Sequence, residues 1–313
     1  MAASPPQRTA PPRRRIDMIR KYIEAQVLGL TGLALGGVDF ENPPGDPGLF
    51  GPGSASWKVH GDFTSMLIGG IAALLMQMLH PLALAGVWDH SNFRKDMLGR
   101  LRRTGQFISG TTFGSTADAE RLIERVRNIH SQVRGIAPDG RPYAADDPDL
   151  LTWVHVAEVS SFLAAHLRYR NPALPPAEQD RYYDEISLIA CRLGARDVPR
   201  SRAEIAAYLD RMRPTLVCDA RTREIAEILL SNPPALSPWA RPVSKAMLLA
   251  GVGLLPDWAA DMLGVYRPAW QRRATDIAIG RIAPVLRWAV RNGSAHRAKR
   301  RVGLLPPAAG PGL

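Results

Sequence analysis

The sequence predicts an all-α fold, organised as a single large helical domain. Apolar residues recur at steps of three and four over long stretches, which is the spacing of one face of an α-helix. Capping residues, prolines and glycines separate these stretches, and no segment shows the strict two-residue alternation of a half-exposed strand. With 313 residues, of which 46% are hydrophobic, the chain is long enough to bury a sizeable core.

The boundaries of the helices can be predicted from individual residues. Asp62 and Thr64 are capping residues in front of the apolar stretch MLIGGIAALLMQML, which we expect to form a central helix. Pro81 can open the next helix, because a first-turn residue needs no free N–H. Thr116 caps a further stretch, and Gly135 is its expected terminator. In chain order, the expected helices run over about 16–30, 63–79, from 81 onward, and over 95–109, 117–134, 150–169, 176–194, 201–212, 219–231, 238–250, 256–263 and 268–290.

Three segments are expected along the chain. Residues 1–15 read as a disordered basic arm, and they contain no apolar core of a secretory signal. Residues 16–290 form the helical domain, which a loop rich in proline and glycine interrupts at 41–56. Residues 291–313 read as a basic flexible tail.

The charge of the chain points to non-specific rather than specific partners. Lys and Arg outnumber Asp and Glu by 40 to 29, which gives a formal charge of +11. Much of this excess lies at 11–15 and 291–303. Basic ends of this kind are more often solvated tails, or contacts with anionic lipid or RNA, than specific readers of a nucleic-acid sequence. We therefore expect no specific nucleic acid partner, and peripheral contact with an anionic membrane as an alternative. The oligomeric state is not predicted.

Cysteine usage and hydropathy predict a cytoplasmic protein. Cys191 and Cys218 are far apart and follow no metal-binding spacing, which argues against a disulfide framework and a zinc site. No charge-free apolar stretch of about 18 residues is present, so a membrane-spanning helix is not expected. The nearest candidates, 66–79 and 246–255, read as buried helices.

One histidine stands out as a candidate metal ligand. His130 lies near the end of its predicted helix, beside the apolar Val126 and Ile129. A proximal haem histidine needs an apolar surrounding and a neutral imidazole whose second nitrogen is held by a carbonyl or a carboxylate. The backbone carbonyl of Val126 is the expected partner. His155 is the alternative ligand, although burial behind the site against Trp153 is the favoured interpretation for it.

The preceding predicted helix carries a basic cluster. Arg100, Arg103 and Thr104 share one face at steps of three and four. In a distal pocket, Arg103 and Thr104 would donate hydrogen bonds to dioxygen, and Arg100 would pair with a haem propionate or with a carboxylate such as Asp96 or Glu124. On a surface helix the same cluster would be a solvated basic stripe.

Two glycines in the same predicted helix, Gly105 and Gly110, would let it approach a flat cofactor closely.

The sequence lacks the motifs of other catalytic and metal sites. The chain has no HExxH, no GxSxG and no pair of Glu-x-x-His motifs for a di-iron bundle.

The order of several short motifs resembles the MpaB-type oxygenase family, the bacterial relatives of latex clearing protein (a rubber oxygenase) and of the fungal mycophenolic-acid pathway oxygenase. The resemblance covers about 60–270. It rests on QMLHP at 77–81, RLRRT at 100–104, Phe113-Gly114, His130, Gly135, YAADDP at 143–148, WVH at 153–155 and LLPDW at 254–258.

The resemblance implies a globin-like core that binds haem b, with His130 as the proximal ligand. It also implies dioxygen-dependent oxidation of an apolar, unsaturated small molecule, for which the helix at 67–79 could line a channel. In latex clearing protein a lysine precedes the distal threonine, whereas Arg103 precedes Thr104 here. Arginine stays protonated and cannot act as a base, which disfavours rubber as the substrate. A haem-binding or membrane-surface helical protein without catalytic activity is the alternative.

Overall fold

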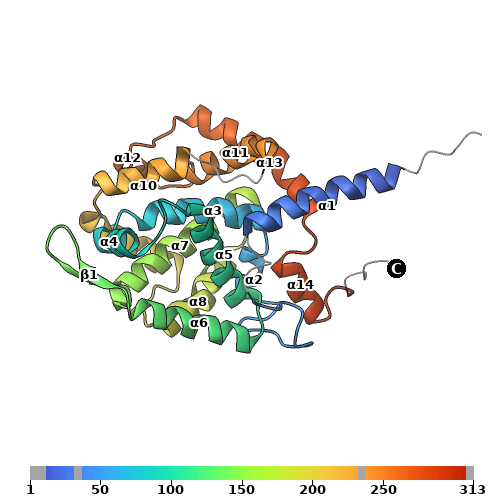
Figure 1. Cartoon of the computed structure of the whole chain (residues 1–313), viewed down its shortest axis with the longest axis horizontal. Helices are drawn as coiled ribbons and strands as arrows, with labels where there is room; N and C mark the ends of the chain where they lie inside the picture. The colour runs from blue at the N-terminus through green and yellow to red at the C-terminus, as the bar shows by residue number, and fades with distance from the viewer. Residues whose placement is uncertain (1–11, 32–36, 232–236, 308–313) are drawn as a thin grey trace, which may run out of the picture.

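Most of the expected helices are present in the computed structural model of the chain, which describes residues 12–31, 37–231 and 237–307. The fold is mostly helical, with one small two-stranded sheet (Figure 1). The α-helices are α1 (Pro12–Thr31), α2 (Ala55–His60), α3 (Phe63–Gln77), α4 (Pro81–His90), α5 (Met97–Phe113), α6 (Thr116–His130), α7 (Pro148–Tyr169), α8 (Pro176–Leu193), α9 (Arg202–Met212), α10 (Ala220–Ser231), α11 (Arg241–Val252), α12 (Asp257–Met262), α13 (Ala269–Ala289) and α14 (Ser294–Arg301). Short 3-10 turns lie at Arg213–Thr215 and Pro238–Ala240, and β1 (Arg134–Ile136) pairs antiparallel with β2 (Pro142–Ala144).

The two ends of the domain differ from expectation. The first helix begins at Pro12, so the expected disordered arm of residues 1–15 is helical over its last four residues; the remainder lies outside the described residues. Residues 294–301, expected within a flexible tail, form α14 instead. Figure 1 shows α1 extending beyond the rest of the domain.

Strands were not expected, and the small hairpin replaces the last predicted turn of a helix. α6 ends at His130 because the chain beyond it pairs with a second strand, in which Tyr143 lies opposite Gly135. A Cβ atom on Gly135 would lie 2.4 Å from the Tyr143 hydroxyl oxygen, so this position requires glycine. The same hydroxyl donates a hydrogen bond of 2.5 Å to Asp89 and so ties the hairpin to α4.

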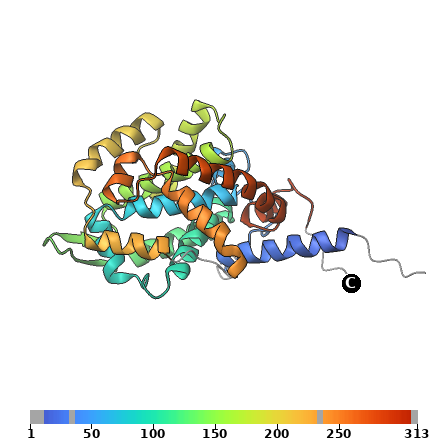
Figure 2. The same ribbon diagram turned by 90° about the horizontal axis from the view of Figure 1, so that it is seen from above.

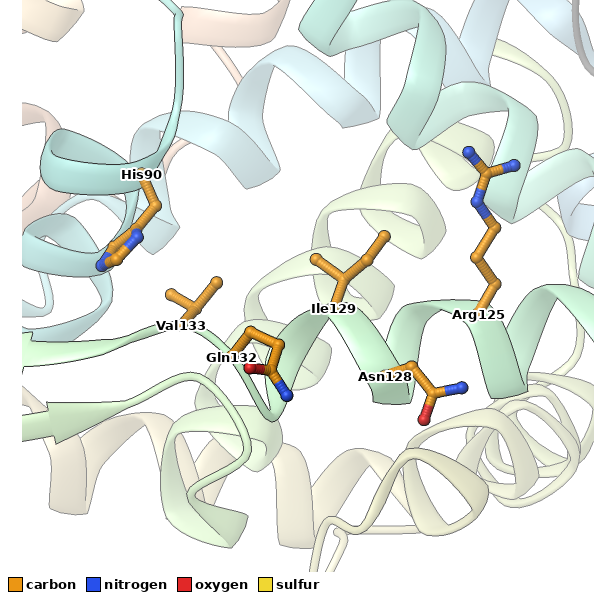
Figure 3. A pocket seen from close by; sticks show the side chains of 6 residues that line it. All are labelled: His90, Arg125, Asn128, Ile129, Gln132 and Val133. Atoms are coloured by element: carbon orange, nitrogen blue, oxygen red, sulfur yellow. The ribbon is translucent and has the colours of Figure 1, made fainter.

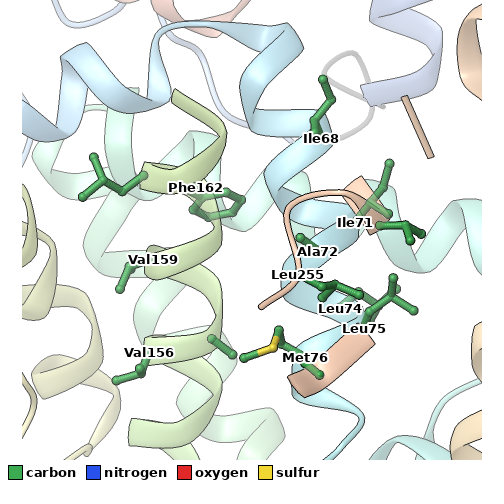
Figure 4. Close-up of a cluster of buried hydrophobic side chains, with 14 of the residues drawn as sticks. Ile68, Ile71, Ala72, Leu74, Leu75, Met76, Val156, Val159, Phe162 and Leu255 are labelled. Carbon is green, nitrogen blue, oxygen red and sulfur yellow. The ribbon is translucent and has the colours of Figure 1, made fainter. Parts of the chain in front are cut away.

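The centre of the domain is a close antiparallel pair formed by α3 and α7. At one end of the pair, the Trp153 indole donates to the Gln77 carbonyl oxygen at 3.3 Å. At the other end, the backbone of Gly69 lies directly against Phe162. Figure 4 shows the buried aliphatic side chains of both helices, and Figure 2 shows α3 enclosed by the surrounding helices when seen from above.

Replacing Gly69 by alanine is expected to destabilise the fold by about 1–3 kcal/mol, because overpacking forces the backbone apart. An added Cβ would lie 2.9 Å from the Ser161 carbonyl oxygen and 3.0 Å from Phe162. The neighbouring Gly70→Ala is the control, since its Cβ would meet only one Phe162 ring atom, at 3.9 Å. Chemical denaturation of both variants measures the difference. Equal stability would contradict the close approach at Gly69.

The other side of α3 is also covered by protein. A Cβ atom on Gly251 of α11 would lie 2.6 Å from the Ile71 side chain. The helix therefore packs against α7 and α11, where a substrate channel had been expected.

The burial of α3 and α7 also indicates whether either helix could span a membrane. Among the described residues, α7 is the one single helix long and apolar enough to span a membrane, and α3 with α4 passes the same test only as a pair bent by 105°. Because 72% of the apolar window of α7 is buried, it has the character of a core helix.

Helix α14 is held to the domain by one buried arginine. Arg301 is 3% exposed. Its guanidinium donates hydrogen bonds to the main-chain carbonyls of Asp46 (2.8 Å), Phe40 (3.1 Å), Phe113 (2.8 Å) and Gly114 (3.1 Å). This side chain therefore joins α14 to the glycine-rich loop and to the C-terminal end of α5.

Candidate functional site

An open hollow lies between the end of α4 and the C-terminal half of α6, with a volume of about 810 Å³. It is lined by His90, Arg125, Asn128, Ile129, Gln132 and Val133 (Figure 3). This volume is within the range of pockets that hold cofactors and small molecules. The Ile129 side chain is 52% exposed and forms an apolar wall of the hollow.

His130 follows Ile129 directly at the end of α6 and is half-buried. Its Nδ1 atom is buried and has no hydrogen-bond partner, so the expected bond to the Val126 carbonyl is not made. Burial lowers the pKa of the imidazole, and the charge of Asp146 opposes this only in part. The ring is therefore neutral at neutral pH, which is the form that binds a metal.

The hollow contains a cation that the sequence analysis missed. Arg125 lies one helical turn before Ile129, and its side chain reaches into the hollow without an ion-pair partner among the described residues (Figure 3). The spacing of Arg125, Ile129 and Gln132 marks one side of α6. That spacing was visible in the sequence, but the neighbouring α4 that completes the hollow was not.

The basic cluster on α5 is placed differently from the prediction. Arg103 and Thr104 are exposed, and the Arg103 guanidinium lies 3.5 Å from Asp96, the N-cap residue of α5. Arg100 is half-buried, and burial followed by the nearby Arg103 charge lowers its pKa. No hydrogen bond or ion pair among the described residues joins these three side chains to His130.

The carboxylates considered as partners of Arg100 pair elsewhere. Asp96 contacts Arg103, and Glu124 lies 3.8 Å from Arg127 on its own helix. Of the two α5 glycines expected to approach a flat cofactor, Gly110 serves packing, since a Cβ there would lie 2.2 Å from the Leu122 side chain. Gly105 faces open space, so its close approach to a flat group stays a prediction.

A second group of titratable residues lies in the core between α2, α7 and α8. The ring of His60 bridges two hydroxyl groups, with Nδ1 2.9 Å from Thr112 and Nε2 2.9 Å from Tyr182. Burial, followed by the nearby charges of His166 and His155, lowers the His60 pKa to about 3. The burial of His60 depends on partners more than fifty residues away in the sequence.

The alternative ligand, His155, belongs to this buried group. It is 8% exposed, and burial lowers its pKa to about 4. Its Nε2 atom has no hydrogen-bond partner, and neither has Nδ1 of His166, about three turns further along α7. His155 is thus buried as its favoured interpretation required, but it retains a free ring nitrogen.

Glu158 in the same region is expected to make stability depend on pH. Burial raises the pKa of this carboxyl from its usual 4.5 to about 7, so the folded state keeps a proton that the unfolded chain releases above pH 4.5. Stability is therefore present below pH 4.5 and lost as the pH rises through 7, by about 2–3 kcal/mol between pH 5 and 8.

The Glu158→Gln variant removes this contribution and leaves the acid sensitivity of the buried histidines unchanged. Urea denaturation of both proteins at pH 5 and pH 8 measures the difference. Parallel loss of stability in the two proteins would show that Glu158 is ionised in the fold.

Two family motifs have structural roles in this chain. His80 is the N-cap of α4, where Nδ1 accepts a hydrogen bond from the Ala83 backbone at 3.5 Å, and Pro81 occupies the first turn. Asp147 caps α7 by accepting hydrogen bonds from the Asp149 and Leu150 backbones. These motifs fix where the two helices begin, and so position α4 and α7 around the candidate site.

Fold and site together define a helical protein with an open hollow against α6 and, on the same helix, a half-buried neutral imidazole that has an unpartnered ring nitrogen. The chain belongs to the oxygenase family described as ER-bound oxygenase mpaB/B'/rubber oxygenase, because residues 57–291, well over half of its length, match the catalytic domain of that family. The resemblance seen in the sequence is thereby confirmed. No curated protein and no solved structure matches the chain.

Proposed function

We propose that this protein is a haem-b oxygenase that uses dioxygen to oxidise an apolar, unsaturated small molecule. The observation that carries the proposal is His130 in a member of an oxygenase family: a half-buried neutral imidazole whose buried Nδ1 atom has no hydrogen-bond partner. His130 directly follows Ile129, which lines the hollow of about 810 Å³, but His130 is not itself a lining residue. A haem held there would supply the iron at which dioxygen is activated.

The residues around the hollow fit such a group. His130, next to the lining residue Ile129, would hold the iron, because its lowered pKa favours the neutral imidazole that binds a metal. Arg125 supplies an uncompensated positive charge, which suits a propionate carboxylate. Ile129 offers an exposed apolar surface in the hollow, which favours contact with an apolar substrate.

Arg100, Arg103 and Thr104 keep their proposed roles as catalytic and cofactor-contacting residues on α5. Arg100 is the best placed of the three, since burial strengthens the interaction of its charge with any negative charge that develops nearby. Arg103 and Thr104 are exposed, so they would act on a substrate at the solvent side.

We also propose that the protein works in the cytoplasm. Both cysteines are free, Cys191 on the surface and Cys218 partly buried, which suits a reducing compartment.

The test is the visible absorption spectrum of the purified protein, recorded as isolated and after reduction with dithionite. A Soret band with reduced-state bands of haem b, at about one haem per chain, supports the proposal. A colourless protein that also fails to take up added haemin would overturn it. Bound haem without oxygen consumption on any unsaturated substrate would favour the alternative, a haem-binding protein without catalytic activity.

A further inference from the structure

The solvent-facing side of α13 carries large apolar side chains that remain uncovered. Trp270 is 70% exposed, Ile277 53%, Val285 48% and Trp288 37%. Their helical spacing places them along one side of this 21-residue helix. Several large apolar side chains exposed on one side of a helix indicate an interaction site rather than scattered exposed residues.

The same side of α13 is basic and contains no carboxylate. Arg273 and Arg281 are exposed between the apolar residues, and neither makes an ion pair among the described residues. The single acidic residue of the helix, Asp276, faces the protein and binds Arg168 (2.7 Å) and Tyr169 (3.0 Å). The exposed side is therefore positive as well as apolar.

Helix α1 packs against the C-terminal end of α13. The Arg20 guanidinium donates to the Ala289 carbonyl at 3.3 Å, and Glu24 accepts from the backbone N–H of Arg291 at 2.6 Å. The part of α1 that extends beyond the domain (Figure 1) exposes four more apolar residues. They are Ile16 (51%), Met18 (65%), Ile19 (51%) and Tyr22 (54%).

We propose that the exposed side of α13, together with α1, docks onto the surface of an anionic lipid bilayer. Tryptophans among arginines are the side chains that helices lying in a membrane interface use, with indoles at the headgroup level and guanidinium groups on lipid phosphates. The apolar segment 243–258 cannot take this role, because it is largely buried: Met247, Leu248 and Leu255 are 3–4% exposed. The exposed Arg273 and Arg281 are complementary in charge to lipid phosphates, so we expect anionic lipid to be the partner of this surface.

Co-sedimentation of the full-length protein with vesicles tests this inference. We expect binding to phosphatidylcholine vesicles that contain about 30% phosphatidylglycerol, weakening with added salt, and little binding to phosphatidylcholine alone. Neutralising two arginines in Arg273→Gln/Arg281→Gln should lower the partition coefficient by about 30-fold. The matched control, Arg196→Gln/Arg211→Gln, removes the same charge from exposed positions in the loop between α8 and α9 and on α9. It should stay within about twofold of the unaltered protein.

The apolar part of the surface is tested separately with Trp270→Ser/Ile277→Ser. This variant should bind vesicles at least about tenfold more weakly, because it removes the apolar anchors. Its circular dichroism and thermal unfolding should match the unaltered protein, because both residues are exposed. Equal loss in the charge variant and its control would show attraction to the overall charge alone, and would overturn the inference.

The alternative partner for this surface is a second copy of the chain. Sedimentation equilibrium in the absence of lipid distinguishes it. A dimer that Trp270→Ser/Ile277→Ser dissociates, without vesicle binding by the unaltered protein, would replace membrane docking with self-association. Neither result depends on haem or on oxygenase activity.

Discussion

Replacing His130 by alanine should leave the purified protein almost without haem, at less than about a tenth of the occupancy of the unaltered protein. The side chain is the half-buried neutral imidazole at the end of α6, and its Nδ1 atom has no protein partner. Loss of an axial ligand costs more than loss of a residue that merely supports one, which alone weakens binding about 10–100-fold. The ratio of Soret to protein absorbance measures the effect.

Three further variants make this test specific. His90→Ala removes another imidazole at the hollow, but His90 is exposed and its Nε2 contacts the Arg134 carbonyl at 3.2 Å, so haem should be retained. His130→Gly should regain a haem spectrum when imidazole is added, because the small ligand can occupy the vacated space. If His155→Ala loses haem while His130→Ala keeps it, the ligand is His155.

Replacing Arg301 by alanine should destabilise the fold by about 3–5 kcal/mol, which exceeds what most single substitutions cost. The guanidinium is almost wholly buried and donates to four main-chain carbonyl oxygens. Truncation leaves these acceptors without donors in a region closed to water. Thermal and chemical unfolding provide the measurement.

The matched control is Arg297→Ala on the same helix. Arg297 is partly exposed and pairs with Asp39 at 3.4 Å, and a pair of this kind contributes about 0–1 kcal/mol. Arg301→Lys should be intermediate, because it keeps the charge but cannot reach several carbonyls at once. If Arg301→Ala and Arg297→Ala cost the same, the buried arginine does not anchor α14.

The helices could be predicted where local residues determine them. Asp62 accepts a hydrogen bond from the backbone of Ser65 in the structure, and Pro81 occupies the first turn of α4, as their types suggested. The missed elements depend on distant partners. In the six-residue α2, the Ser56 backbone and hydroxyl both donate to Glu185. α14 looked like a solvated basic run because its one buried arginine has no local signature.

In the candidate site, too, local features could be predicted from the sequence, whereas features that depend on tertiary packing could not. His130 could be singled out from its place at the end of an apolar helical stretch, and the family resemblance named the same residue. The orientation of α5 could not be read from spacing, because a helix with Arg100, Arg103 and Thr104 on one face can turn that face to a cofactor or to water. The role of Arg125 depends on how α4 meets α6, which is a property of the tertiary packing.

The contact between α3 and α7 at Gly69 has a consequence for substrate selection. Where two backbones are in contact, there is no space for a substrate between them. A long substrate chain cannot pass between α3 and α7 at Gly69, so the interior cannot select substrates by chain length at this point. The hollow at α6 opens to solvent instead, so it would bind one end of a long substrate and leave the rest of the molecule in solvent. Homologous unsaturated hydrocarbons of increasing length should therefore be turned over with similar kcat/KM once the reacting double bond and its nearest carbons are matched.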